Sequence, residues 1–174
     1  MELLDLVDKD GKPIGKTIVR SDNISFNDGE YVCAVHVWLQ NSNGEFLIQK
    51  TSKIKGNVFA VTGGMVESGE SSKPAAFREV WEELGIDISR ENVVNLGHII
   101  HDNALLLCVF LLQKDFSHEK FTLQKREVAS IRWFDLDKIE KMNAEKTLRG
   151  SSYTSLNLVK QYLSKLYLTS QNGI

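Results

Sequence analysis

The stretch GMVESGESSKPAAFREVWEELGI, residues 64–86, is the most informative part of this sequence for its fold and function. It contains three clustered acids, Glu79, Glu82 and Glu83, which are spaced i, i+3 and i+4. On an α-helix this spacing places the acids on one face, with Glu79 one turn from each of the others. Because three like charges so close together destabilise a bare helix, the pattern indicates a bound positive group. A hard divalent cation such as Mg²⁺ fits, since it prefers oxygen ligands.

The rest of the stretch has the features of an amphipathic helix with defined ends. Ser71 or Ser72 can cap its N-terminus, and Gly85 can end it. The side away from the acids carries apolar residues that we expect to pack into the core: Phe77, Val80, Trp81 and Leu84. A merely solvated acidic face is the alternative interpretation, but it explains neither the fixed glycines nor the arginine.

The spacing G-x5-E-x7-R-E-U-x-E-E-x-G-U, in which U is aliphatic, resembles the Nudix box. The matching residues are Gly64, Glu70, Arg78, Glu79, Val80, Glu82, Glu83, Gly85 and Ile86. This resemblance to the Nudix hydrolase family implies an α/β fold in which a mixed β-sheet is sandwiched between α-helices. It also implies a pyrophosphohydrolase that uses Mg²⁺, or alternatively Mn²⁺, to activate a water molecule. The substrate class it implies is a nucleoside diphosphate-linked or other diphosphate compound, cleaved at a phosphoanhydride bond.

The same resemblance implies catalytic roles for five residues of the stretch. Glu79, Glu82 and Glu83 match the family's cluster of metal ligands and catalytic base, with Glu79 and Glu83 as the first choice for ligands. Arg78 and Glu70 match a buried ion pair that orients the acids.

Three positions outside this cluster complete the implied metal site. The carbonyl group of Gly63 or Gly64 resembles the family's backbone ligand. Glu127 lies just before a predicted strand, in a region where family members often place a further carboxylate. We therefore include these three residues among the expected metal ligands.

A basic segment before the box is the expected substrate-binding region. Lys50, Lys53 and Lys55 lie in or beside the loop TSKIKGN, residues 51–57, and lysine is a good point-charge partner for phosphate. A solvated loop is an equally weighted alternative. Phe59 is included because it could stack on a base, although a core role is an alternative for it, as it is for Trp38.

The first half of the chain narrows the resemblance to one branch of the family. The segments ELLDLVDKDGKPIGK (2–16), YVCAVHVWL (31–39) and GEFLIQKTSKIKG (44–56) resemble Nudix proteins related to isopentenyl-diphosphate isomerase. Those isomerases carry a catalytic cysteine and a metal-binding histidine where this chain has Thr62 and Gly64. These departures favour hydrolysis. An isomerase and a non-catalytic Nudix-fold binding or regulatory module remain the alternatives.

Apolar patterns outside the box predict the elements of a single domain, residues 1–174. The expected elements are an N-terminal β-hairpin (1–20), strands at 31–40, 45–50, 93–99, 104–112 and 130–134, and a C-terminal helix at about 154–168. The strand at 31–40 is a nearly continuous apolar run, which is typical of burial on both faces. It contains His36, which we expect to be satisfied within the sheet, with a ligand-facing base as the alternative. The apolar stripe of the C-terminal helix predicts a core or dimer contact.

Composition limits the expected partners. The net charge of −2 gives no electrostatic case for binding nucleic acid or an anionic membrane. No apolar run approaches the ~20 residues of a membrane span, and the N-terminus is acidic where a signal peptide would be positive. We therefore expect a cytoplasmic protein with a small-molecule diphosphate substrate and leave a homodimer open.

Overall fold

The computed structural model describes residues 2–21, 26–117 and 120–171, so that residue 1 of the predicted hairpin lies outside the described part. Within that part the strands are β1 (Leu3–Val7), β2 (Pro13–Val19), β3 (Tyr31–Gln40), β4 (Phe46–Thr51), β5 (Phe59–Ala60), β6 (Thr62–Met65), β7 (Val94–His101), β8 (Leu105–Gln113) and β9 (Val128–Phe134). The α-helices are α1 (Ser72–Leu84), α2 (Leu136–Ala144) and α3 (Gly150–Gln171), and a short 3₁₀ helix spans Lys53–Lys55. Each predicted strand is present, with shifts of one or two residues at its ends.

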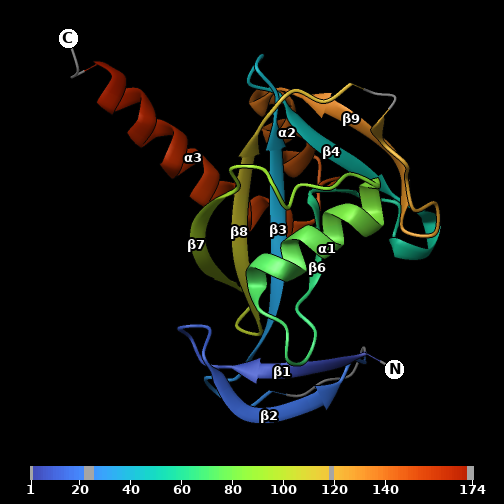
Figure 1. Cartoon of the computed structure of the whole chain (residues 1–174), viewed down its shortest axis with the longest axis vertical. Helices are drawn as coiled ribbons and strands as arrows, with labels where there is room; N and C mark the ends of the chain where they lie inside the picture. Colours follow the sequence, from blue (N-terminus) through green and yellow to red (C-terminus); the bar gives the residue numbers. More distant parts are fainter. Residues whose placement is uncertain (1, 22–25, 118–119, 172–174) are drawn as a thin grey trace.

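The long strand β3 is the centre of a mixed β-sheet (Figure 1). It runs parallel to β8 over the whole register from Val32↔Leu105 to Gln40↔Gln113. On its other side it pairs antiparallel with β6 and, at its start, with β1. Because β3 has partners on both edges and is mostly apolar, it is buried as predicted.

The two faces of the sheet pack against different helices. Alternate residues of β3 point to opposite faces: Val35 and Val37 join the cluster that contains Val80 and Leu84 of α1. Trp38 belongs instead to the cluster under α2 and α3. In Figure 1, α1 lies in front of the sheet and α2 behind it. This arrangement confirms the predicted α/β class with a mixed sheet sandwiched between helices.

Helix α1 has the predicted ends but not the whole predicted buried side. Ser71 is its N-cap, and Gly85 ends it in the left-handed conformation, with φ of 70°. Phe77 packs against the core, but Trp81 is 59% exposed, so the prediction that Trp81 lies in the core is wrong. Since an α-helix turns about 100° per residue, Trp81 is rotated from the fully buried Val80 toward solvent.

Helix α3 is longer than predicted at both ends. Its first half packs on the sheet through Leu156 and Val159, which are fully buried. Its second half extends past the sheet (Figure 1), and there Leu166 is 42% exposed. Over the described residues, none of the helices is both long and apolar enough to cross a membrane.

Candidate functional site

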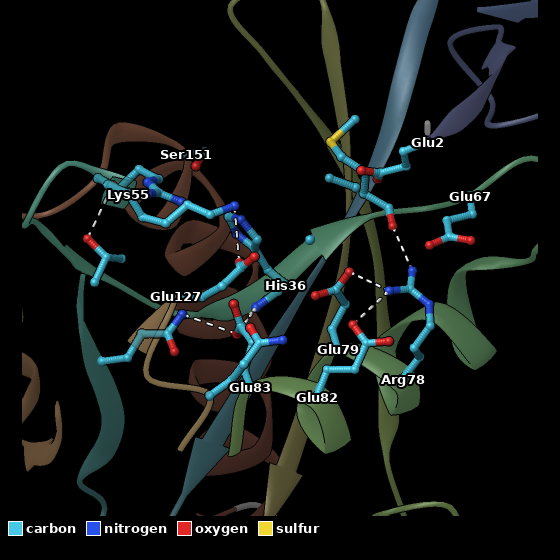
Figure 2. A pocket seen from close by; sticks show the side chains of 18 of the residues that line it. Glu2, His36, Lys55, Glu67, Arg78, Glu79, Glu82, Glu83, Glu127 and Ser151 are labelled. Carbon is cyan, nitrogen blue, oxygen red and sulfur yellow. Dashed lines mark hydrogen bonds and ion pairs between the residues drawn. The ribbon is translucent and has the colours of Figure 1, made fainter. Parts of the chain in front are cut away.

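A cavity of about 330 Å³ lies where α1, β3, β6 and the start of α3 meet (Figure 2). Strand pairing builds its floor, because Val35 and His36 of β3 are opposite Gly64 and Gly63 of β6. The three acids Glu79, Glu82 and Glu83 of α1 line one wall, together with Arg78. The structure therefore brings the predicted acid cluster and the predicted glycine backbone to one place.

Glu83 is a buried carboxyl group in this wall. It is only 5% exposed, and its Oε2 accepts hydrogen bonds from the Gly63 amide and from Gln49 Nε2, both at 3.2 Å. Burial, followed by the nearby charge of Glu79, raises the pKa of Glu83 to about 8. The side-chain oxygen of Gln49, Oε1, is buried without a hydrogen-bond partner among the described residues.

Arg78 holds Glu79 and Glu70 in place. Its Nη1 donates to Glu79 Oε1 at 2.8 Å, and its Nη2 donates to Glu70 Oε2 and to the Met65 carbonyl, each at 2.9 Å. Burial still raises the pKa of Glu79, although the positive charge of Arg78 opposes that shift. The Arg78–Glu70 pair that the resemblance implied is thus present, with Glu70 outside the cavity and Glu79 as a further partner.

The donor set of this wall fits a divalent cation. A Cβ at Gly64 would lie 2.2 Å from Glu79 Oε1, so the absence of a side chain lets this carboxylate lie against the β6 backbone. Over residues 2–21, 26–117 and 120–171, no three acidic, histidine or cysteine side chains converge on one point, because Glu79 is turned toward Arg78 and Glu83 toward Gly63. Glu83 is buried and Glu79 is half-buried, and the pKa of each carboxyl group is raised, so that a bound Mg²⁺, which prefers hard oxygen ligands, would favour their ionised forms.

The opposite wall of the cavity is more basic. Figure 2 shows Lys55, Glu127 and Ser151 across the cavity from Glu79 and Glu82. Lys55 Nζ forms an ion pair with Glu127 Oε2 at 3.1 Å. The predicted further metal ligand Glu127 thus reaches the same cavity as the box acids, with a lysine as its partner.

The other predicted substrate-binding residues lie outside the cavity. Lys53 is exposed in the 3₁₀ helix. The Lys50 ammonium group lies 4.4 Å from the centre of the Phe59 ring, and that ring packs edge-to-face on Phe134. Phe59 therefore has the core role that was its alternative, as does the fully buried Trp38.

His36 combines the two roles that the sequence left open. It lines the cavity, and its Nδ1 lies 2.8 Å from the hydroxyl of Ser155, which also accepts a hydrogen bond from Trp38 Nε1. Burial, with smaller contributions from the charges of Arg149 and His101, lowers the pKa of His36 to about 3. It is therefore a neutral histidine, satisfied on one side and facing the cavity on the other.

Sequence reasoning missed several cavity residues, among them Gln49, Arg149 and Ser151. Gln49 lies in a strand, and the alternation of residues along a strand does not distinguish it from other polar strand residues. Arg149 and Ser151 lie more than 60 residues after the box acids, so only the folded chain shows that they share a cavity with them.

Comparison with known proteins agrees with this architecture. Residues 30–154 match the family model described as the NUDIX domain. An uncharacterized Nudix hydrolase of Listeria innocua is 33% identical over 148 residues, which covers 83% of this chain and 86% of that protein. The NAD-capped RNA hydrolase NudC of Stutzerimonas stutzeri is 25% identical over 129 residues, covering 74% of this chain and 42% of NudC.

Solved structures show the same fold. A Deinococcus radiodurans crystal structure superposes with a TM-score of 0.74 at 24% identity, covering 91% of this chain and 98% of that one. The NUDIX domain of Shewanella oneidensis NrtR, solved with ADP ribose, gives a TM-score of 0.60 at 13% identity, and the match covers 76% of this chain and 88% of that one. With the matching domain, the close relatives and the box acids gathered in one cavity, the chain belongs to the Nudix family and is a Nudix hydrolase.

Proposed function

We propose that this chain hydrolyses a phosphoanhydride bond in a nucleoside diphosphate-linked or other diphosphate compound, with Mg²⁺ or Mn²⁺ as its cofactor. The observation that carries the proposal is the wall of box acids. Its three carboxyl groups, of which Glu83 is buried and Glu79 half-buried, line one cavity beside the glycine backbone of β6, where a divalent cation would find several oxygen ligands together.

Each residue of the wall has a proposed role in this reaction. Glu79, Glu82, Glu83, Glu127 and a carbonyl group of β6 would hold the cation, which when bound would neutralise phosphate oxygens and make a nearby water molecule more acidic. Arg78 orients Glu79 by a direct hydrogen bond.

Glu70 and Lys55 have supporting roles, Glu70 from outside the cavity and Lys55 from its opposite wall. Glu70 fixes the guanidinium group of Arg78 and so acts through it. Lys55 presents positive charge to the anionic substrate from across the cavity.

Glu83 is, with Glu79, the first choice for a carboxylate ligand of the cation. The hydrogen bonds from Gly63 and Gln49 fix the orientation of Glu83 Oε2. One of the three box acids would accept the proton of the attacking water molecule.

A panel of diphosphate compounds, scored by product identity, tests the proposal. NAD and ADP-ribose head the panel, because they occur in the names of a relative and of a structural neighbour. We expect Mg²⁺-dependent release of a monophosphate product, loss of roughly 100-fold or more in kcat for Glu83→Gln because a charged ligand of the cation is removed, and unchanged rates for the control Glu145→Gln. Glu145 is an exposed carboxylate next to the end of α2.

Two outcomes would replace the proposal. If every compound stays intact with both Mg²⁺ and Mn²⁺, a non-catalytic binding module takes its place. Conversion of isopentenyl diphosphate to its allylic isomer would instead assign an isomerase, despite Thr62 and Gly64 at the isomerase positions.

A further inference from the structure

The cavity has a second wall that the box acids do not explain. Its residues come from the end of the α2–α3 connection and the first turn of α3, and they include Arg149 and Ser151, with His36 on the adjoining floor. Figure 2 shows Ser151 on the far side of the cavity from Glu79, Glu82 and Arg78. One side of the cavity thus carries clustered carboxyl groups, and the other carries an arginine and a helix start.

The start of α3 is held firmly against the sheet. The Arg149 amide donates to the Phe59 carbonyl at 2.8 Å, and the Phe59 amide donates to the Thr147 carbonyl at 2.9 Å. One turn on, the Ser152 hydroxyl accepts a hydrogen bond from the Val61 amide at 3.2 Å. These three bonds fix the position of the first turn at the cavity edge.

Polar groups of this first turn are left without protein partners. In the described ranges of the chain, the amides of Gly150 and Ser151 have no hydrogen-bond acceptor. The Ser151 side chain lines the cavity, is only 8% exposed, and makes no hydrogen bond to any described residue. The neighbouring serines Ser152 and Ser155, by contrast, are both engaged in structural hydrogen bonds. A hydroxyl that opens to the cavity and has no protein partner among the described residues is available to a ligand.

The exposed side chain of Arg149 is also available to a ligand. Its Nη2 donates to the Lys55 carbonyl at 3.1 Å, and its guanidinium group has no carboxylate partner within the described residues. The remaining N–H groups of such an arginine suit the oxygens of a phosphate group. The partial positive charge at the N-terminus of a long helix acts in the same direction.

We propose that Arg149, the Ser151 hydroxyl and the free amides of the first turn of α3 form a phosphate-binding subsite. Its ligand is a phosphate group, either of the substrate or of a released phosphate product. The assignment of the ligand to the substrate rests on the proposed function. A diphosphate would then lie across the cavity, with the phosphorus under attack next to the box acids and its other phosphate group at α3.

A metal-free titration with inorganic phosphate tests the subsite. Because its donors are an arginine, a hydroxyl and amides, it needs no cation, unlike the acid wall. With EDTA present, we expect phosphate to shift the ¹⁵N–¹H resonances of Gly150 and Ser151. Arg149→Gln should raise the phosphate Kd about tenfold or more, as expected for loss of a charged donor. The matched control Arg132→Gln, at an exposed arginine of β9, should leave the Kd unchanged.

A second variant keeps the test decisive if Arg149→Gln folds poorly. Ser151→Asp adds a carboxylate to the first turn, where negative charge favours the helix, so we expect it to fold and to lose phosphate binding. The subsite is refuted if phosphate leaves the two amide resonances unmoved, or if the wild type, Arg149→Gln and Ser151→Asp bind it equally. Since the titration involves neither metal nor turnover, its result is independent of whether the chain hydrolyses any diphosphate.

Discussion

Replacing Glu83 by glutamine should abolish hydrolysis and, at the same time, stabilise the metal-free protein. The wild-type carboxyl group is 5% exposed and lies near the charge of Glu79, which raises its pKa from the ordinary 4.5 to about 8. Glutamine has nearly the same shape, retains an oxygen that can accept from Gly63 and Gln49, and carries no charge. It therefore removes the cost of burying a carboxylate without opening a cavity.

The pKa shift sets the magnitude and its sign. As the pH rises above 4.5, the unfolded carboxyl group loses its proton while the folded one keeps it until about 8. The folded state then binds more protons than the unfolded state, so stability falls with rising pH over this window and levels off above it. At about 1.4 kcal/mol per pH unit, the loss reaches roughly 3 kcal/mol near pH 7. Glu83→Gln should recover most of this, whereas below about pH 4.5 it should change little.

Urea unfolding in EDTA, followed from about pH 4.5 to about pH 8, measures this difference directly. Glu82→Gln is the matched control, because the Glu82 side chain is 45% exposed and its 3.5 Å ion pair with Arg78 is therefore expected to contribute little. We expect the control to match the wild type at every pH. A Glu83→Gln variant that is no more stable than the wild type at neutral pH, or whose advantage does not shrink toward acid pH, would refute the uncompensated burial of Glu83.

Three further predictions concern the same helix and its surroundings. Gly64→Ala should lower kcat with little change in thermal stability, because the new Cβ would lie 2.2 Å from Glu79 Oε1 and force that carboxylate to move. A kcat equal to that of the wild type in steady-state assays would contradict this. Leu84→Ala should cost about 2–5 kcal/mol in urea unfolding, because Leu84 is fully buried, but Trp81→Ala should cost less than about 1 kcal/mol; similar losses would mean that Trp81 is packed after all. Arg78→Lys should lower kcat and change KM little, since lysine cannot make the forked contacts that orient Glu79. A change in KM alone would count against this role.

Local patterns predicted most of the strands and the acid wall well, whereas the layered arrangement of the fold was implied by the resemblance of the box. The positions of Glu79, Glu82 and Glu83 follow from helical spacing alone, and Gly85 ends the helix for a reason visible in its residue type. The nearly continuous apolar run of β3 likewise predicted its burial on both faces. Such features depend on neighbours a few residues apart, which the sequence displays directly.

Features that depend on distant contacts were not predictable in this way. The lysines of the basic loop were grouped by proximity in sequence, yet only Lys55 lines the cavity, because Lys50 turns onto Phe59. Trp81 was predicted in the core because it is apolar, but whether a residue at the edge of a helix face is buried depends on the elements that pack beside it. Arg149 carried no local signal, since its role comes from the backbone bonds between its segment and β5.

The parallel pairing of β3 with β8 has a consequence for how the chain folds. Val32 pairs with Leu105, 73 positions later, so the central strand gains this neighbour only after a long loop closes. Contacts of such high sequence separation slow folding, and parallel pairing is slow for the same reason. During synthesis the box helix is complete well before β8 emerges, while β3 still presents an unpaired apolar edge. We therefore expect the nascent chain to be most prone to aggregation in that interval, and the two walls of the cavity to meet only in the last step of folding.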